Sequence, residues 1–393
     1  MCGNDVLAST LAPSQSKMAK GLLLSAYDAG SHRYWRKGLE KYLSEYDWTV
    51  IALPARFFSW RIRGNPISFL AQYSAELSAD YDFIIATSMV DLATLKGITP
   101  SLASVPSLIY FHENQFEYPK TKNQTASIEP QMVNLYSAMS ADTLIFNSEF
   151  NRDSFFAGVD QLMTKLPDYT VTRLSKQFAA KSSVIPVPVN DDWFEVVRLN
   201  NRKIASAINK DVPIKIVWNH RWEYDKGPGR LLGFISELQA RDVVFELNIV
   251  GEAFRQVPAE FNEIERRFGE NIKTFGYVRD AQAYKALLAQ CDIVLSTAIH
   301  EFQGISVMEA VSAGCLPLVP DRLSYQALIP EQYRYRSNIN SPELESVSAV
   351  DRLFEIISAP STTIRSDFQR YGWTILVESY STAIKALLKR SAV

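Results

Sequence analysis

Two glutamates in the segment HEFQGISVME, Glu301 and Glu309, flank the predicted start of a helix. They are eight residues apart, and Gly304 between them marks where the helix should begin. Glu301 should therefore lie in the preceding loop, and Glu309 about one and a half turns into the helix. The backbone amides of Gly304, Ile305 and Ser306 would form its positive end, which favours a phosphate group. The segment predicts a nucleotide-sugar pocket; the alternative is a loop glutamate and a half-buried helix glutamate without a ligand.

Two cations follow another predicted strand, in the segment NHRWEYDKGPGRLL. Arg221 and Lys226 are five residues apart, between the end of that strand and the next helix. The diphosphate of a sugar donor needs cationic partners, because negative charge builds on it as it leaves. Arginine supplies a fork of donors and lysine a compact, mobile charge. The pair predicts a diphosphate site, and the alternative is two solvated loop cations.

The four histidines all lie at or just beyond the ends of predicted strands: His32, His112, His220 and His300. In an open α/β sheet these ends form the ligand crevice, so the sequence predicts that the histidines line one cleft. The segment DAGSHRYW also places Gly30 where backbone could approach a ligand closely. It does not match G-x-G-x-x-G, so a dinucleotide site is not supported.

Two segments of the first half indicate an acceptor site. HENQFEYP (112–119) gathers acidic, amide and aromatic side chains directly after a buried strand, although some of them could merely order the loop. ARFFSWRIRG (55–64) follows the second strand as a predicted loop and interleaves arginines with aromatic residues. Arginines seat phosphates and aromatic rings stack on bases, as in proteins that hold single-stranded RNA. Inward-packed aromatic residues with solvated arginines are an equally weighted alternative. The residues concerned are Arg56, Phe57, Phe58, Trp60, Arg61 and Arg63.

These segments need elements that bring them together, and the sequence predicts alternating strands and helices of the α/β class. Short, nearly continuous apolar runs alternate with amphipathic segments, as in parallel sheets covered on both faces. Strands are expected at 21–27, 48–54, 82–88, 107–113, 142–148 and 182–188, and again at 214–220, 245–251, 272–278, 292–298 and 315–320. Helices in the second half are expected at 228–241, 258–268 and 281–290.

The alternation stops once and restarts, which predicts two Rossmann-like domains facing each other across a cleft. The last helix, at 363–389, is expected to pack back toward the first domain. The expected divisions are a disordered tail at 1–17, a first domain at 18–195, a polar connection at 196–212, a second domain at 213–365 and the returning C-terminal helix at 366–393.

Composition narrows the class of protein. The 393 residues are 47% hydrophobic and carry a net charge of −2, so a nucleic-acid or membrane partner would have to meet a local basic patch. The three cysteines form no CxxC pair, which argues against a disulfide framework or a zinc site. No apolar run approaches the ~20 residues of a membrane span, and 1–17 lacks the pattern of a secretory signal. We therefore expect a cytoplasmic protein without stable membrane association.

The spacing of Glu301 and Glu309, with Arg221 and Lys226 upstream, resembles the retaining family-4 glycosyltransferases of GT-B fold. The resemblance is closer to one branch, the tRNA-queuosine mannosyltransferases, and runs from about residue 22 to the C-terminus. The matching segments are GSH (30–32), LPARFFSWR (53–61), YFHENQFEYP (110–119), FNSEFNRDSF (146–155), WNHRWEYDK (218–226), HEFQGISVMEAV (300–311) and CLPLVP (315–320).

The resemblance implies transfer of mannose, with retention, from GDP-mannose to the cyclopentene diol of queuosine in the anticodon of a tRNA of the tRNA-Asp type. The partners would be queuosine-containing tRNA and the nucleotide sugar. Retention implies attack on the same face of the sugar, with the leaving phosphate accepting the proton of the acceptor. No cofactor and no metal are expected, because Arg221, Lys226 and the helix terminus offset the diphosphate charge.

Matching positions carry the roles of the family onto this sequence. Arg221 and Lys226 would bind the diphosphate and Glu309 the donor ribose, while Glu301 and His112 would face the sugar from opposite sides of the cleft. The expected catalytic residues are Glu301, His112, Arg221 and Lys226. Further donor contacts are expected from Gly30, Gly251, Tyr277, Gly304, Ile305 and Ser306. Acceptor or tRNA contacts are expected from His32, Arg56, Trp60, Arg61, Arg63, Glu113, Asn114 and Gln115.

Two rival functions stay open at this point. A GT-B transferase acting on a lipid or polysaccharide would need a basic, apolar docking helix, and residues 62–79 are weakly basic for that role. A non-catalytic RNA-binding protein on the same scaffold would not need the paired glutamates, Arg221 and Lys226.

Overall fold

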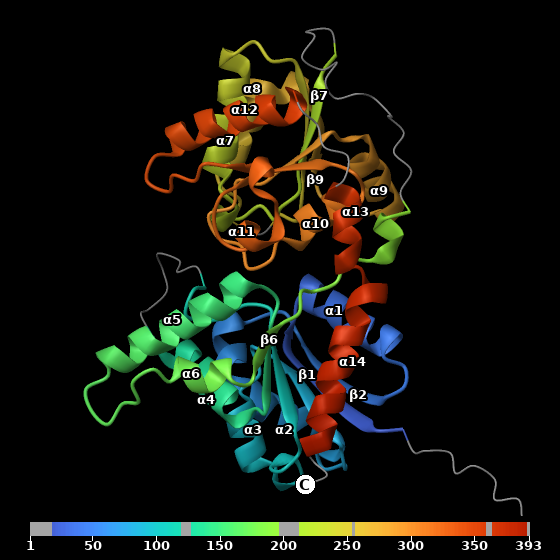
Figure 1. Cartoon of the computed structure of the whole chain (residues 1–393), viewed down its shortest axis with the longest axis vertical. Helices are drawn as coiled ribbons and strands as arrows, with labels where there is room; N and C mark the ends of the chain where they lie inside the picture. The colour runs from blue at the N-terminus through green and yellow to red at the C-terminus, as the bar shows by residue number, and fades with distance from the viewer. Residues whose placement is uncertain (1–17, 119–126, 196–211, 254–255, 359–363, 391–393) are drawn as a thin grey trace, which may run out of the picture.

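The computed structural model describes residues 18–118, 127–195, 212–253, 256–358 and 364–390. They form two α/β domains, stacked one above the other in Figure 1, each built on a six-stranded parallel sheet flanked by helices. The predicted fold class is therefore confirmed. The predicted tail at 1–17 and nearly all of the connection at 196–212 lie outside the described residues.

The N-terminal sheet has the strand order β2-β1-β3-β4-β5-β6. Its strands are β1 (Lys20–Asp28), β2 (Asp47–Pro54), β3 (Phe83–Thr87), β4 (Ser107–Phe111), β5 (Thr143–Phe146) and β6 (Ser182–Val184). The apolar runs are continuous because both faces are covered: Leu22 and Leu24 enter one core cluster, and Leu23 enters another on the opposite face. The helices are α1 (Gly30–Tyr42), α2 (Phe58–Leu77), α3 (Leu92–Ile98), α4 (Glu129–Ser140), α5 (Glu149–Lys165) and α6 (Ser175–Ala179).

The C-terminal sheet has the order β12-β11-β10-β7-β8-β9. Its strands are β7 (Ile214–Trp218), β8 (Phe245–Val250), β9 (Ile272–Gly276), β10 (Ile293–Leu295), β11 (Leu316–Pro320) and β12 (Arg334–Tyr335). The short β12 was not predicted, because two residues are too few to show a period. The helices are α7 (Pro228–Ala240), α8 (Glu260–Phe268), α9 (Ala281–Gln290), α10 (Ile305–Ser312), α11 (Tyr325–Leu328), α12 (Pro342–Ser358), α13 (Ile364–Phe368) and α14 (Trp373–Arg390).

Each sheet has a point at which the strand order reverses. In the N-terminal sheet it lies between β1 and β3, and in the C-terminal sheet between β7 and β10. Ligands of open α/β sheets bind beyond the carboxyl ends of strands at such points. The segments after β1, β7 and β10 are those that carry Gly30, Arg221 and Glu301.

The C-terminal helix packs against the N-terminal domain, as expected (Figure 1). Trp373 stacks on Tyr42 with ring centroids 5.1 Å apart, and the Tyr380 hydroxyl accepts a 3.1 Å hydrogen bond from Trp35. The prediction of one continuous helix at 363–389 is wrong. A 3-10 turn at Gln369–Tyr371 and extended Gly372 separate α13 from α14, because this segment crosses between the domains and pairs with Val189.

Direct hydrogen bonds join the two domains beside the crossing segment. The Gln303 side chain accepts from the backbone amide of Val187 at 2.9 Å and donates to its carbonyl oxygen at 2.8 Å. The Ser148 hydroxyl donates to the carbonyl oxygen of Phe302. These contacts hold the loop after β10 against the N-terminal domain. Among the described residues, no helix is long and apolar enough to cross a membrane.

Candidate functional site

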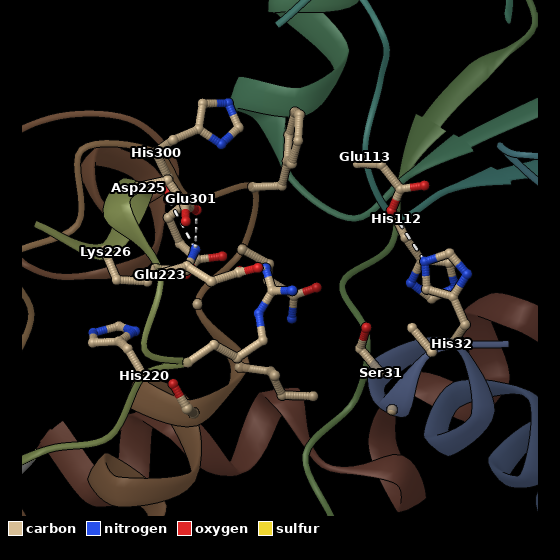
Figure 2. A pocket seen from close by; sticks show the side chains of 18 of the residues that line it. Ser31, His32, His112, Glu113, His220, Glu223, Asp225, Lys226, His300 and Glu301 are labelled. Atoms are coloured by element: carbon tan, nitrogen blue, oxygen red, sulfur yellow. Dashed lines mark hydrogen bonds and ion pairs between the residues drawn. The ribbon is translucent and has the colours of Figure 1, made fainter. Parts of the chain in front are cut away.

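A cavity of about 1200 Å³ lies between the two domains and is lined by both. Figure 2 shows its two walls: Lys226, Glu301 and their neighbours belong to the C-terminal domain, and His32 and His112 face them from the N-terminal domain. All four histidines line this cavity, so the strand ends converge as predicted.

A buried ion pair organises the C-terminal wall. The Lys226 Nζ lies 3.1 Å from Glu301 Oε2 and 3.1 Å from Asp225 Oδ2, and it donates to the carbonyl oxygen of His300 at 2.9 Å. Burial raises the pKa of Glu301, but the charge and hydrogen bond of Lys226, together with the charges of His220 and Arg221, outweigh burial and hold the pKa at about 2. Glu301 is therefore a fixed carboxylate, unable to act as a proton donor near neutral pH.

The backbone at Gly227 brings Lys226 and Glu301 together. Gly227 has a φ of 69°, and a Cβ there would lie 2.2 Å from the carbonyl oxygen of Thr297. The Thr297 hydroxyl also donates to the carbonyl oxygen of Lys226 at 2.9 Å. The loop after β7 thus packs tightly onto the loop after β10, which a side chain at position 227 would prevent.

Arg221 lines the same wall, and its side chain is half exposed. Its guanidinium group lies 3.0 Å from Glu223 Oε2. Burial raises the pKa of Glu223, and the positive charge of Arg221 opposes that shift. Asp225 and Glu223 were not singled out from the sequence; their only signal was proximity to the two predicted cations.

The helix terminus predicted to hold a phosphate opens onto the cavity. Gly304, with a φ of 83°, precedes the first turn of α10, and Gly304, Ile305 and Ser306 all line the cavity. A Cβ on Gly304 would come within 2.8 Å of the Tyr325 ring, so a larger residue would displace the helix start. Ile305 packs against the core cluster of the N-terminal domain, which places this terminus at the domain boundary.

Glu309 lies one turn deeper in α10 and is partly buried. Burial raises the pKa of its carboxyl group to about 8. Glu309 does not border the cavity, and no hydrogen bond or ion pair joins its carboxyl group to another of the described residues. Burial raises the pKa values of Tyr34 in the N-terminal domain and of Tyr284, and the charge of Glu309, when it is ionised, raises them further.

Two stacked imidazoles form the centre of the N-terminal wall. The rings of His32 and His112 lie 4.1 Å apart, with an angle of 18° between their planes. Glu113 holds His32 in place through a 3.0 Å contact with Nε2, and the Ser88 hydroxyl donates to the second carboxylate oxygen at 3.0 Å. Burial, followed by repulsion from His32, lowers the pKa of His112 well below its ordinary value, so His112 is neutral. His112 Nε2 and His32 Nδ1 are buried without a described hydrogen-bond partner.

Gly30 occupies the first position of α1, beside Ser31, and both line the cavity. A Cβ on Gly30 would meet no atom within 4 Å, so the glycine borders open space. The N-termini of α1 and α10 therefore both border the cavity, one from each domain.

Several predicted contacts do not reach the cavity. Asn114 is fully buried and donates to Asn151 at 2.9 Å, while the backbone amide of Gln115 donates to the side chain of Asn134 at 2.8 Å. Both residues order the loop after β4, which is the alternative left open for that segment. Gly251 packs so closely on the loop after β7 that a Cβ would lie 1.8 Å from the carbonyl oxygen of His220. Tyr277 is 64% exposed and lies away from the cavity lining.

The segment 55–64 differs from the predicted loop, because α2 begins at Phe58 and includes most of it. Arg61 is buried and donates to the Ser68 hydroxyl at 3.1 Å. Arg63 forms ion pairs with Asp91 and Glu129. Trp60 is 50% exposed, and exposed Arg56 precedes the helix. Helical spacing turns these side chains to different sides, so they do not form one basic surface.

Sequence reasoning missed an aromatic part of the lining. Tyr27, Phe58 and Tyr118 all border the cavity. Phe58 and Tyr118 had been noted only as members of aromatic-rich segments, and Tyr27 stood within a predicted strand. Separately, no cluster of three or more potential metal-ligating side chains occurs within the described ranges.

Comparison with known proteins agrees with this geometry. Residues 20–189 match the family described as tRNA-queuosine alpha-mannosyltransferase N-terminal, and residues 200–334 match glycosyl transferases group 1. The chain is 33% identical over 337 residues to the tRNA-queuosine alpha-mannosyltransferase of Drosophila melanogaster, covering 85% of this chain and 88% of the fly protein.

Solved structures show the shared fold. HepE of Anabaena, in complex with UDP and glucose, superposes with a TM-score of 0.62 at 14% identity, covering 94% of this chain and 100% of that chain. Sucrose-phosphate synthase of Thermosynechococcus elongatus gives 0.66 at 14% identity, with coverages of 95% and 100%. At such identities the likeness establishes the GT-B architecture alone. The extended match to the fly protein and the match of residues 20–189 to the family model show that the chain belongs to the tRNA-queuosine alpha-mannosyltransferase family of glycosyltransferases.

Proposed function

We propose that the protein transfers mannose from GDP-mannose to queuosine in the anticodon of a tRNA of the tRNA-Asp type, with retention at the sugar and without a metal ion. The observation that carries the proposal is the cavity between the domains, where Lys226 and Glu301 face His112. The extended identity to the fly tRNA-queuosine alpha-mannosyltransferase supports the acceptor. An acceptor of this kind implies a cytoplasmic protein.

The donor binds on the C-terminal wall. Arg221 and Lys226 neutralise the diphosphate together with the amides at the start of α10. As the bond to the sugar breaks, negative charge builds on the diphosphate, so these groups stabilise it more strongly. The carboxylates beside both cations keep them charged and fixed in position. Glu309 does not border the cavity, so the contact expected between its carboxyl group and the donor ribose stays a prediction.

The sugar lies between Glu301 and His112. Since the pKa of Glu301 is about 2, its carboxylate stabilises the positive charge that develops at the reacting carbon. Neutral His112 offers its unpartnered Nε2 to a sugar hydroxyl. The bond from the anomeric carbon to the diphosphate breaks, and the bond to the acceptor oxygen forms on the same face. The proton of the acceptor hydroxyl passes to the leaving phosphate oxygen, so no protein side chain has to serve as the base.

The acceptor enters from the N-terminal wall. His32, held by Glu113, has a buried Nδ1 without a described partner and lies against His112, where a hydroxyl of the cyclopentene diol can reach both imidazoles. Gly30 leaves open space beside this position.

Nucleoside mass spectrometry tests the donor. Queuosine-containing tRNA is incubated with the protein and, separately, GDP-mannose, GDP-glucose, UDP-glucose and UDP-galactose. We expect one hexose on queuosine with GDP-mannose alone, and an α linkage by NMR of the isolated nucleoside. Transfer from a uridine nucleotide, or a β linkage, would contradict the proposed donor or the proposed retention.

A further inference from the structure

The N-terminal part of the cavity contains an aromatic surface to which no role has yet been given. Tyr27 follows the buried part of β1, Phe58 begins α2, and Tyr118 lies in the loop after β4. The rings of Tyr27 and Phe58 meet edge to face at 5.8 Å, and those of Phe58 and Tyr118 stack at 5.4 Å. We call these three residues the aromatic platform.

The platform is rigid and still accessible. Tyr27 and Phe58 pack against the core cluster of the N-terminal domain, which fixes their rings, yet all three side chains are only partly buried and border the cavity. The hydroxyl of Tyr118 lies near enough to Arg221 and Glu223 to interact with their charges. The platform therefore faces the charged wall of the C-terminal domain.

Two aromatic residues close to Phe58 in the sequence are more exposed than the platform. Phe57 is 69% exposed and Trp60 is 50% exposed. Phe57 has a φ of 57°, a left-handed conformation that a phenylalanine adopts only at a cost. The Trp60 ring lies against Gly64, where a Cβ would come within 2.5 Å of it. We call Phe57 and Trp60 the outer pair.

The chemistry of this surface indicates its ligand. Of the three arginines nearby, Arg61 is buried and Arg63 is engaged by Asp91 and Glu129, while the Arg56 guanidinium lies 5.6 Å from the Phe57 ring. Few cations are thus available for phosphates, whereas three aromatic rings border the cavity and two more are exposed on the neighbouring residues Phe57 and Trp60. Rigid rings with one cation suit unstacked nucleobases, which bind single-strand-binding proteins mainly through their faces.

The size of the cavity allows a base to enter beside the donor. Small-ligand pockets usually occupy about 300–1,000 Å³, and this cavity of about 1200 Å³ exceeds that range. A nucleoside modified on its base must bring that base inside for its substituent to reach His112 and Glu301. Its neighbours in the loop then remain at the rim.

We propose that the aromatic platform stacks on the base of the acceptor nucleoside inside the cavity, and that the outer pair stacks on an adjacent base of the same tRNA loop. This inference rests on the proposed function, since it takes the acceptor to be a tRNA nucleoside. Of the two contacts expected for segment 55–64, it keeps the stacking of aromatic rings on bases and drops the arginine contacts to phosphates.

The outer pair is tested by a double-mutant cycle, in which one change is made in the protein and the other in the tRNA. Trp60→Ala and wild type are assayed with GDP-mannose on queuosine-containing tRNA, and on the same tRNA made abasic at each neighbour of queuosine in turn. We expect Trp60→Ala to lower kcat/KM about tenfold through KM on intact tRNA. On one of the two abasic tRNAs the variant and wild type should be nearly equal, because the contact is already lost there.

Tyr169→Ala is the matched control, because Tyr169 is 99% exposed and lies on the loop after α5, away from the cavity. Phe58→Leu, which keeps an apolar side chain against the core, tests the platform. Phe58→Leu should raise KM for tRNA. Its affinity for GDP, measured by calorimetry, should equal that of wild type, which would show that the variant is folded.

The outcomes separate the two proposals. Wild-type protein that leaves queuosine tRNA unmodified contradicts both the proposed function and this inference. Active wild-type protein with an unchanged KM in Trp60→Ala, or with the same loss on all three tRNAs, contradicts the inference alone. An unchanged KM for tRNA in Phe58→Leu likewise rules out the platform.

Discussion

Lys226 and Glu301 form a buried ion pair of 3.1 Å between the loops after β7 and β10, the two strands at which the order of the C-terminal sheet reverses. Their side chains are 8% and 16% exposed. A buried charge without a partner is strongly unfavourable, so each residue keeps the other ionised. The pair therefore fixes a positive and a negative charge at the position where negative charge would develop on the diphosphate and positive charge on the sugar.

Glu301→Gln removes the negative charge while keeping the shape of the side chain. If the carboxylate stabilises the developing positive charge of the sugar, kcat should fall by about two orders of magnitude. GDP carries no sugar, so its affinity by calorimetry should change little. Glu270→Gln, at an exposed position outside the cavity lining, is the control. A wild-type kcat for Glu301→Gln would exclude the assigned role.

His112→Leu should separate activity from stability. The Nε2 of His112 is buried without a described partner and its ring is neutral, so the folded protein gains little from its polarity. We expect transfer to fall by about one to two orders of magnitude, while Tm by calorimetry is unchanged or higher. A clear fall in Tm together with normal turnover would mean that His112 is a structural residue.

Gly30→Ala tests whether a substrate occupies the space beside α1. A Cβ at Gly30 meets no atom within 4 Å, and the same holds for Gly97 on α3, outside the cavity lining. Both substitutions should leave Tm unchanged or slightly raised. Only Gly30→Ala should lower kcat/KM, because its methyl group would enter the cavity. Equal activity of the two variants would show that neither substrate approaches α1.

Glu309 should make stability depend on pH. The folded-state pKa is about 8, above the ordinary value of 4.5, so the folded protein retains a proton that the unfolded chain releases. Stability from this group is fully present below pH 4.5 and is lost as pH rises toward 8. Glu309→Gln should therefore stabilise the protein at pH 8, by at least about 1 kcal/mol, and have little effect at pH 4. If the difference in unfolding free energy between wild type and variant is the same at pH 4 and at pH 8, the prediction is wrong.

The sequence predicted those parts of the site that depend on local pattern. Gly304 and Glu301 stand at a strand-to-helix turn whose spacing and glycine position reveal the geometry. Arg221 and Lys226 follow a strand that is apolar except for Lys215, so the carboxyl end of a buried strand could be located. Residues at such ends converge in any parallel sheet, which is why all four histidines line one cavity.

Contacts that arise from tertiary packing were not predictable in this way. Arg61 and Trp60 are adjacent in sequence, yet the helix turns one into the core and leaves the other exposed. Asn114 looks like a ligand-binding amide but satisfies buried groups of α5. The platform residues Tyr27 and Tyr118 meet on Phe58 only after three separate segments have folded together. The pattern of apolar residues within any one segment does not indicate that contact.

The most direct test compares two tRNAs that differ at a single nucleoside, carrying queuosine or guanosine at the same anticodon position. Each is incubated with GDP-mannose and wild-type protein or Lys226→Ala, and its nucleosides are measured by mass spectrometry. The account predicts one added hexose on queuosine with wild type, none on the guanosine tRNA, and a strongly reduced yield with Lys226→Ala. Hexose on the guanosine tRNA, no transfer to queuosine, or full transfer by Lys226→Ala would contradict it.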